Sequence, residues 1–364
     1  MKIKIYSIVL LFILFGCIGC KGNENNQSLA DSTSECDFSP SPYIFNFPSH
    51  FPEYNIPRSN ATTFEGIALG RRLYYDKLIS KGGPMAGNAC ASCHVQTTSF
   101  SKVTTSGTSV LPHINLGYAS FFLWDGKISG SLEDIMYFEV ADFFQADLLL
   151  INANDNYRKM NCEAFGTFEV TYQSMANSLA QWLRRLNSHK SKYDMYLEGL
   201  VELTSDELSG KILFEGAADC HICHPLPLTT DFIFHNNGLN EFSAPGDAGL
   251  NEIDQGRYKI THLESDLGLF KTPTLRNIVL TSPYMHDGRF KTLEEVVQHY
   301  NRNLKYSWTL DFFLGQVKKD INNESGLYIL DMSEGDVNSI VAFLKTLTDQ
   351  SFIVDPDLSS PFVD

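Results

Sequence analysis

Two short motifs constrain this chain of 364 residues more than any other feature. Six of its eight cysteines form three close pairs, and a histidine follows two of these pairs, in Cys90-Ala91-Ser92-Cys93-His94 and Cys220-His221-Ile222-Cys223-His224. Cys-x-x-Cys-His is the attachment signature of c-type haem, because two thiols on one turn reach both vinyl groups of a porphyrin and the adjacent histidine reaches the iron. The sequence therefore predicts two covalently bound haems, one at each motif.

Other uses of close cysteine pairs fit less well. A thioredoxin-type redox pair needs a surrounding βαβ pattern, which neither motif has. A structural zinc site needs a second close pair of ligands nearby, and the two motifs are far apart in the chain.

The sequence around the motifs repeats. Residues 70–74 (Gly-Arg-Arg-Leu-Tyr) are echoed by residues 210–214 (Gly-Lys-Ile-Leu-Phe), and residues 124–127 (Trp-Asp-Gly-Lys) by residues 286–289 (His-Asp-Gly-Arg). Apolar residues recur at helical spacing near both motifs, and helix starts are expected at Thr292 and at Ser333. The sequence therefore predicts two copies of one haem-binding unit, in a mainly α fold with long loops.

The net charge limits the kind of partner, and the N-terminal residues indicate the cellular compartment. The net charge of −15 and the lack of a basic cluster exclude a nucleic-acid partner. Lys2 and Lys4 precede an apolar run over residues 5–15, which is typical of a secretory signal. A small residue before a cysteine, followed by the polar tether after Cys20, indicates a lipoprotein signal. Cys17 has Leu at −3 and Gly at −1, whereas Cys20 has only the Gly, so Cys17 is favoured as the lipid-bearing residue. A periplasm-facing, membrane-anchored lipoprotein is expected.

These observations divide the chain. We expect a signal peptide (1–16), a tether and N-terminal extension (17–50), an N-terminal cytochrome c domain (51–190), a C-terminal cytochrome c domain (191–350) and a tail (351–364). Cys36 and Cys162 remain outside the close pairs, and they are either a disulfide or two free buried thiols.

Longer motifs carry a family resemblance. Residues 270–277 (Phe-Lys-Thr-Pro-Thr-Leu-Arg-Asn), residues 283–288 (Pro-Tyr-Met-His-Asp-Gly) and residues 235–239 (His-Asn-Asn-Gly-Leu) carry it in the second half, and residues 124–126 in the first. With them the chain resembles the bacterial dihaem cytochrome c peroxidases of the superfamily that includes MauG.

The resemblance implies roles for several residues. His94 and His224 are then the proximal ligands of the two haem irons, and Trp124 carries electrons between the haems. A calcium ion would bind backbone oxygens of Thr281 and Pro283, although Ser109 stands at the position of an asparagine ligand.

The resemblance also bears on the remaining iron ligands. Tyr300 occupies the position of the sixth ligand of the second haem, where peroxidases of the usual type have methionine and MauG-like proteins have tyrosine; His299 and Met285 are alternatives. Ser101 stands near the position of a distal histidine, which suggests an open first haem. His113 is expected to be a locally satisfied histidine.

Peroxide cleavage needs a distal acid/base group. In an alignment without gaps, the two family positions are occupied by Ile135 and Gln145, and an amide cannot shuttle a proton. Either the alignment slips and Glu139, Asp142 or Asp147 fills the role, or peroxidase activity is impaired; Gln145, by position, and Glu139, by chemistry, are the catalytic candidates.

The expected activity is reduction of hydrogen peroxide at the first haem, with electrons delivered through the second by a small donor protein of cytochrome c or cupredoxin type. One alternative is MauG-like oxidation of tryptophan or tyrosine side chains of a partner protein. The other is an electron-transfer cytochrome without peroxidase activity.

Overall fold

Helices dominate the computed structural model, which describes residues 36–102, 108–244, 254–315 and 330–362. The predicted signal peptide, Cys17 and Cys20 lie outside the described residues. Within them, none of the helices has the length and apolar character needed to span a bilayer. The helices are α1 (Phe64–Tyr75), α2 (Cys90–Cys93), α3 (Leu132–Phe138), α4 (Leu148–Asn152), α5 (Asp155–Phe165), α6 (Tyr172–Arg185), α7 (Lys192–Leu197), α8 (Ser205–Glu215), α9 (Tyr258–Thr261), α10 (Leu293–Arg302), α11 (Phe312–Gly315), α12 (Glu334–Thr346) and α13 (Gln350–Val354).

Strands are few and short, as the sequence predicts. Two antiparallel pairs occur in the described part of the chain. β1 (Phe121–Phe122) pairs with β2 (Ile128–Ser129), and β3 (Phe234–His235) pairs with β4 (Phe270–Lys271). The expectation of a mainly α fold is confirmed.

The predicted helix starts are built as capping boxes. The Thr292 hydroxyl accepts a hydrogen bond from the backbone N–H of Glu295 at the start of α10, and the Glu295 carboxylate accepts one from the N–H of Thr292. Ser333 and Asp336 make the same exchange at the start of α12. Each box satisfies backbone donors that a helix start would otherwise leave unpaired.

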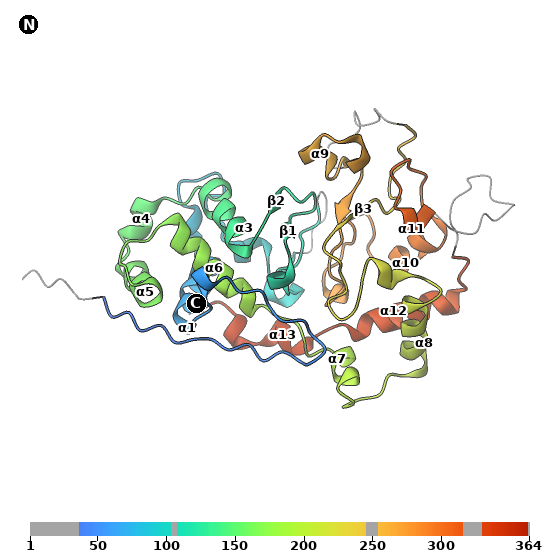
Figure 1. The fold of residues 1–364 in the computed structure, drawn as a ribbon, viewed down its shortest axis with the longest axis horizontal. Helices are drawn as coiled ribbons and strands as arrows, with labels where there is room; N and C mark the ends of the chain where they lie inside the picture. The colour runs from blue at the N-terminus through green and yellow to red at the C-terminus, as the bar shows by residue number, and fades with distance from the viewer. Residues whose placement is uncertain (1–35, 103–107, 245–253, 316–329, 363–364) are drawn as a thin grey trace, which may run out of the picture. The chain divides into compact units, whose positions relative to one another are not determined.

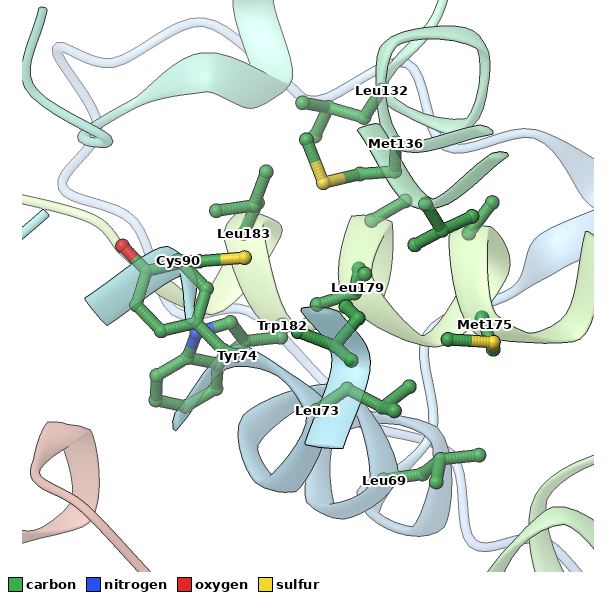
Figure 2. Packing of buried hydrophobic residues seen from close by; sticks show 14 of the residues in the cluster. Leu69, Leu73, Tyr74, Cys90, Leu132, Met136, Met175, Leu179, Trp182 and Leu183 are labelled. Atoms are coloured by element: carbon green, nitrogen blue, oxygen red, sulfur yellow. The ribbon is translucent and has the colours of Figure 1, made fainter. Parts of the chain in front are cut away.

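The first hydrophobic core lies between α1 and α6, with α3 and α5 packed against them (Figure 1). Figure 2 shows Leu73, Tyr74 and Trp182 in this core, together with Cys90 of the first motif. Gly70 allows the close approach of the two main helices, because a Cβ at this position would collide with the backbone of Ser178 on α6.

The second core lies between α8 and α12, and α10 also packs on α12 (Figure 1). Gly210 on α8 repeats the role of Gly70, because a Cβ there would collide with the backbone of Ser339 on α12. The glycine that begins each repeated segment therefore lies where two main helices of its core approach closely.

The last described residues pack against the first core. Phe352 on α13 and Leu358 are buried in the first core, and the Phe352 ring meets that of Phe100 with centroids 5.4 Å apart. The guanidinium of Arg71 on α1 donates hydrogen bonds to the carbonyl oxygens of Ser359 and Pro356. The segment folds back because its apolar side chains complete a core formed by residues far earlier in the chain.

Cys36 and Cys162 form a disulfide, with Cα atoms 5.7 Å apart. Cys162 lies on α5, so the bond ties the N-terminal extension to the first core. Of the two states that the sequence left open, the structure contains the bonded one.

Candidate functional site

The first motif forms α2 and the turn after it. Cys90 is buried, Cys93 is half-buried, and neither is in a disulfide. His94 follows directly, and its Nδ1 lies 2.9 Å from the carbonyl oxygen of Phe100. The aromatic core side chain Tyr74 lies close by, with its hydroxyl 3.4 Å from the carbonyl oxygen of His94.

The second motif repeats this arrangement. Cys220 begins a short 3-10 turn, and Cys223 follows it, again as free thiols. The Nδ1 atom of His224 lies 2.8 Å from the carbonyl oxygen of Thr229. The two motifs thus have the same thiol spacing, and in each the histidine Nδ1 is paired with a backbone carbonyl oxygen a few residues later.

These features fit c-type haem. Histidines that bind metals commonly donate the other ring N–H to a backbone carbonyl, which fixes the tautomer. Here both carbonyls hold Nδ1, so Nε2 is the nitrogen that can bind iron. Burial lowers the pKa of His94 to about 4 and also lowers that of His224, and a neutral imidazole is the form that binds metal. His94 and His224 therefore fit the role of proximal ligands.

A cavity of about 220 Å³ adjoins the second motif. Cys220, Cys223 and His224 line it on one side, and Tyr300 and Met285 also face it. Most of its lining is apolar, as the surroundings of a porphyrin ring require. The cavity is thus the natural place for the second haem.

The first half of the chain also contributes to this cavity, through Trp124. The indole N–H of Trp124 donates a hydrogen bond of 2.7 Å to the carbonyl oxygen of Ser109, and its ring meets the His286 ring edge-on with centroids 6.5 Å apart. Its own carbonyl oxygen accepts a 2.8 Å hydrogen bond from the N–H of Lys271. Trp124 is therefore held by residues of both halves.

The three candidates for the sixth ligand of the second haem are separated by the structure. Tyr300 and Met285 line the cavity, and the amide nitrogen of Asn237 lies 3.2 Å from the Tyr300 hydroxyl and 3.5 Å from the Met285 sulfur. His299 is buried, and its Nε2 is paired with the carbonyl oxygen of Asn237 at 2.9 Å. Burial raises the pKa of Tyr300 to about 12, so the phenol stays protonated unless a cation binds its oxygen.

The acid/base candidates differ in environment. Glu139 is half-buried at the start of a π-helical turn, and burial raises its pKa to about 7, with Lys127 opposing the shift. The charge of Glu139 acts in turn on the Cys90 thiol, so it lies near the first motif. Gln145, Asp142 and Asp147 are exposed, and Gln145 has a left-handed backbone with φ of 50°. The geometry favours Glu139.

Near the first motif, Ser101 and His113 are both engaged locally. The Ser101 hydroxyl donates a 2.6 Å hydrogen bond to the carbonyl oxygen of Val110. The His113 ring stacks on the His94 ring with centroids 3.4 Å apart, and its Nδ1 lies 3.2 Å from the Tyr74 hydroxyl. The tyrosine gives His113 the local partner that was expected for it.

The expected calcium residues lie together, but one of their oxygens already has a partner. The Ser109 hydroxyl donates a 3.1 Å hydrogen bond to the carbonyl oxygen of Pro283, and the Thr281 hydroxyl donates one to Ile278. Calcium prefers six to eight oxygen ligands, usually with carboxylates among them. This geometry adds no support for calcium, which stays a prediction.

Two residues of the cavity were not singled out from the sequence. Asn237 contacts Tyr300 and Met285, and Lys271 places a buried cation in the cavity wall. Both stand in segments that carry the family resemblance, but only their spatial position connects them with the second motif.

Comparisons with known proteins identify similar sequences and a similar fold. The model of a family described as di-haem cytochrome c peroxidase matches residues 64–202. Methylamine utilization protein MauG of Methylorubrum extorquens is 30% identical over 308 residues, which cover 80% of this chain and 80% of that protein. Cytochrome c551 peroxidase of Nitrosomonas europaea is 30% identical over 310 residues, which cover 81% of this chain and 82% of that protein.

The solved structures include a similar fold. The crystal structure of a MauG-like protein associated with microbial copper homeostasis matches with a TM-score of 0.75 and 26% identity, over 88% of this chain and 99% of that one. Sequence similarity over most of the chain, two haem-attachment motifs and this shared fold lead to one conclusion. The chain belongs to the di-haem cytochrome c peroxidase family.

Proposed function

We propose that this chain reduces hydrogen peroxide at a haem bound by residues 90–94, with electrons delivered through a haem bound by residues 220–224. The observation that carries the proposal is the position of Trp124, which the first repeat contributes to the cavity of the second motif. Each haem, when bound, supplies an iron that exchanges single electrons. Trp124 offers an aromatic side chain for electron transfer between the two centres.

In this proposal Glu139 moves the proton. Reduction of peroxide takes up two electrons and two protons and releases two waters. The Glu139 carboxylate would accept a proton from one peroxide oxygen and return it to the other oxygen, which leaves as water when the O–O bond breaks. The remaining oxygen becomes the second water by taking up the two electrons, delivered through the haems, and the two protons. A pKa near the working pH suits a group that must both accept and donate a proton.

The direct test is steady-state consumption of peroxide by the full chain with a reduced small cytochrome c as donor. We expect peroxide loss and donor oxidation to proceed together. Absence of both, at every pH and after prior reduction of the chain, would contradict the proposal.

Glu139→Gln gives a sharper test of the proton step. We expect the rate of the wild type to rise with pH through about 7, because the carboxylate must be ionised to accept a proton. The substitution should lower kcat by about 10²–10⁴-fold and remove this pH dependence. Asp142→Asn is the matched control, since Asp142 is an exposed acid of the same turn. A loss of rate in Asp142→Asn but not in Glu139→Gln would contradict the proposed proton transfer by Glu139.

A second candidate function is oxidation of tryptophan or tyrosine side chains of a partner protein, as in MauG-like proteins. The position of Tyr300 in the cavity wall favours it, because a phenolate ligand stabilises the higher oxidation states of iron. Peroxide should then change the absorption spectrum of both haems before any donor is added. A spectral change confined to one haem would favour the peroxidase hypothesis.

Tyr300→Met tests the proposed ligand. Thioether ligation raises the reduction potential of haem iron relative to an anionic oxygen ligand. We expect the second haem of the variant to have a higher midpoint potential and a changed ligand-field spectrum. His299→Gln is the control, since His299 pairs with the backbone of Asn237. Unchanged spectra in Tyr300→Met, with a change in His299→Gln, would make His299 the ligand.

We further propose that the two cores correspond to the domains 51–190 and 191–350, and that Cys17 anchors the chain to a membrane facing the periplasm. The Cys36–Cys162 disulfide supports an oxidising compartment. The donor is a small cytochrome c or cupredoxin, and the net charge of −15 suits a basic one. One calcium ion at Thr281 and Pro283 belongs to the proposal, but no step depends on it.

A further inference from the structure

Lys271 is a buried cation in the cavity of the second motif. The residue is 6% exposed, and it lines the same cavity as Cys223 and His224. It belongs to β4, and its backbone N–H is held by the carbonyl oxygen of Trp124. The lysine backbone is therefore fixed at the point where the first half of the chain meets this cavity.

The ammonium group of Lys271 lacks a matching anion. Within the described residues it makes no ion pair and no hydrogen bond, and the centroid of the Phe232 ring lies 6.0 Å from Nζ. Burial lowers the pKa of Lys271 to about 8, which is the expected response of a cation that has lost water and gained no partner. Buried charges in proteins are normally paired.

The carboxylates of Asp231 and Asp311 already have hydrogen-bond partners. One oxygen of Asp231 is 2.8 Å from Nε2 of His235, and the other accepts a hydrogen bond from the N–H of Ile233. An oxygen of Asp311 lies 2.6 Å from Nδ1 of the same His235 ring. Asp231 attracts Lys271 only from beyond ion-pair distance. The oxygens of Asp231, the carboxylate whose charge acts on Lys271, are therefore paired with His235 and Ile233 and not with the lysine.

We propose that Lys271 is the counter-ion of a propionate carboxylate of the haem attached at Cys220 and Cys223, and that its charge raises the reduction potential of that haem. A propionate is the only anionic group that a porphyrin brings into this cavity. A fixed positive charge beside the ring stabilises the reduced iron, which carries one electron more. Lys271 is then a cofactor-binding residue that favours acceptance of an electron near Trp124. The inference rests on the proposed attachment of haem at the second motif.

The test is the midpoint potential of the second haem in holoprotein carrying Lys271→Met, which keeps the length of the side chain and removes its charge. We expect the equilibrium constant for reduction to fall about tenfold, which is about 59 mV for one electron. Lys271→Arg should keep the constant within about twofold of the wild type. Lys345→Met is the matched control, because Lys345 is exposed on α12 of the same core, and it should leave the potential unchanged.

An unchanged potential in Lys271→Met, with both haems attached by mass, would overturn the inference. If Lys271→Met does not load haem, Lys271→Gln provides the same comparison with a polar side chain. The potential is measured without peroxide, so it is independent of turnover. A lowered potential in an enzyme that never consumes peroxide would contradict the proposed function alone, and an unchanged potential in an active enzyme would contradict this inference alone.

Discussion

We expect the double variant Cys220→Ser, Cys223→Ser to carry a single covalent haem and to lose oxidation of an external donor. Without the two thiols no thioether bond to the second porphyrin can form, and the electron entry route is removed. The rate of donor oxidation should fall at least about 100-fold, which corresponds to about 2.7 kcal/mol of activation free energy. Mass spectrometry of the intact chain counts the haems, and a donor assay measures the rate.

The mirror variant Cys90→Ser, Cys93→Ser is the matched control. It should also carry one haem, and that haem should still accept electrons from the reduced donor. It should not consume peroxide, because the proposed reacting centre is absent. The opposite pattern, with peroxide consumption kept only when the second motif is intact, would exchange the roles of the two haems.

Arg276→Met should produce the largest loss of stability. Arg276 and Asp194 are both buried, with side chains 0% and 1% exposed, and the Arg276 guanidinium donates a hydrogen bond to the Asp194 carboxylate. The substitution leaves Asp194 as a buried charge without its main partner. Such a loss typically costs about 3–5 kcal/mol of unfolding free energy, measurable by chemical denaturation.

The stability that Arg276 and Asp194 contribute should depend on pH in a predictable direction. Burial alone would raise the pKa of Asp194, but the Arg276 charge and hydrogen bonds outweigh it, so the folded pKa is lowered. A lowered carboxyl pKa adds stability above the unfolded pKa, and this stability is lost as the pH falls through the folded pKa. The difference in unfolding free energy between the wild type and Arg276→Met should therefore become smaller as the pH falls.

Arg158→Met is the control for charge removal. The Arg158–Asp155 pair on α5 is largely exposed, with side chains 46% and 98% accessible, so its loss should change stability by no more than about 1 kcal/mol. Equal effects of the Arg276 and Arg158 substitutions would contradict the assigned burial of the Arg276 pair.

The sequence predicts features that depend on neighbouring residues. The starts of α10 and α12 follow from local capping boxes, and the helical periodicity around Leu73 and Leu213 corresponds to α1 and α8. The repeated glycines also follow a local pattern, although their function as helix crossing points needs the partner helix. The spacing of the motif at residues 90–94 is likewise enough to predict haem attachment.

Features that depend on distant contacts could not be predicted. Phe352 is an apolar residue near the end of the chain, and its burial in the first core depends on contacts with residues far earlier in the sequence. The sequence alone does not decide between Gln145, which stands at the aligned position, and Glu139, which has the suitable carboxyl group, whereas their burial differs. The same holds for Tyr300 and His299, which are neighbours on α10 but face different partners.

The spin and ligation state of each haem, recorded by electron paramagnetic resonance and absorption before and after peroxide, tests the central claim most directly. We predict that the haem at residues 90–94 has an open coordination position and changes on addition of peroxide, whereas the haem at residues 220–224 is six-coordinate. The double variant Cys220→Ser, Cys223→Ser carries only the haem at residues 90–94, so its spectrum shows which signals belong to that haem. Two six-coordinate low-spin haems in every redox state would leave no position for peroxide and would contradict the account.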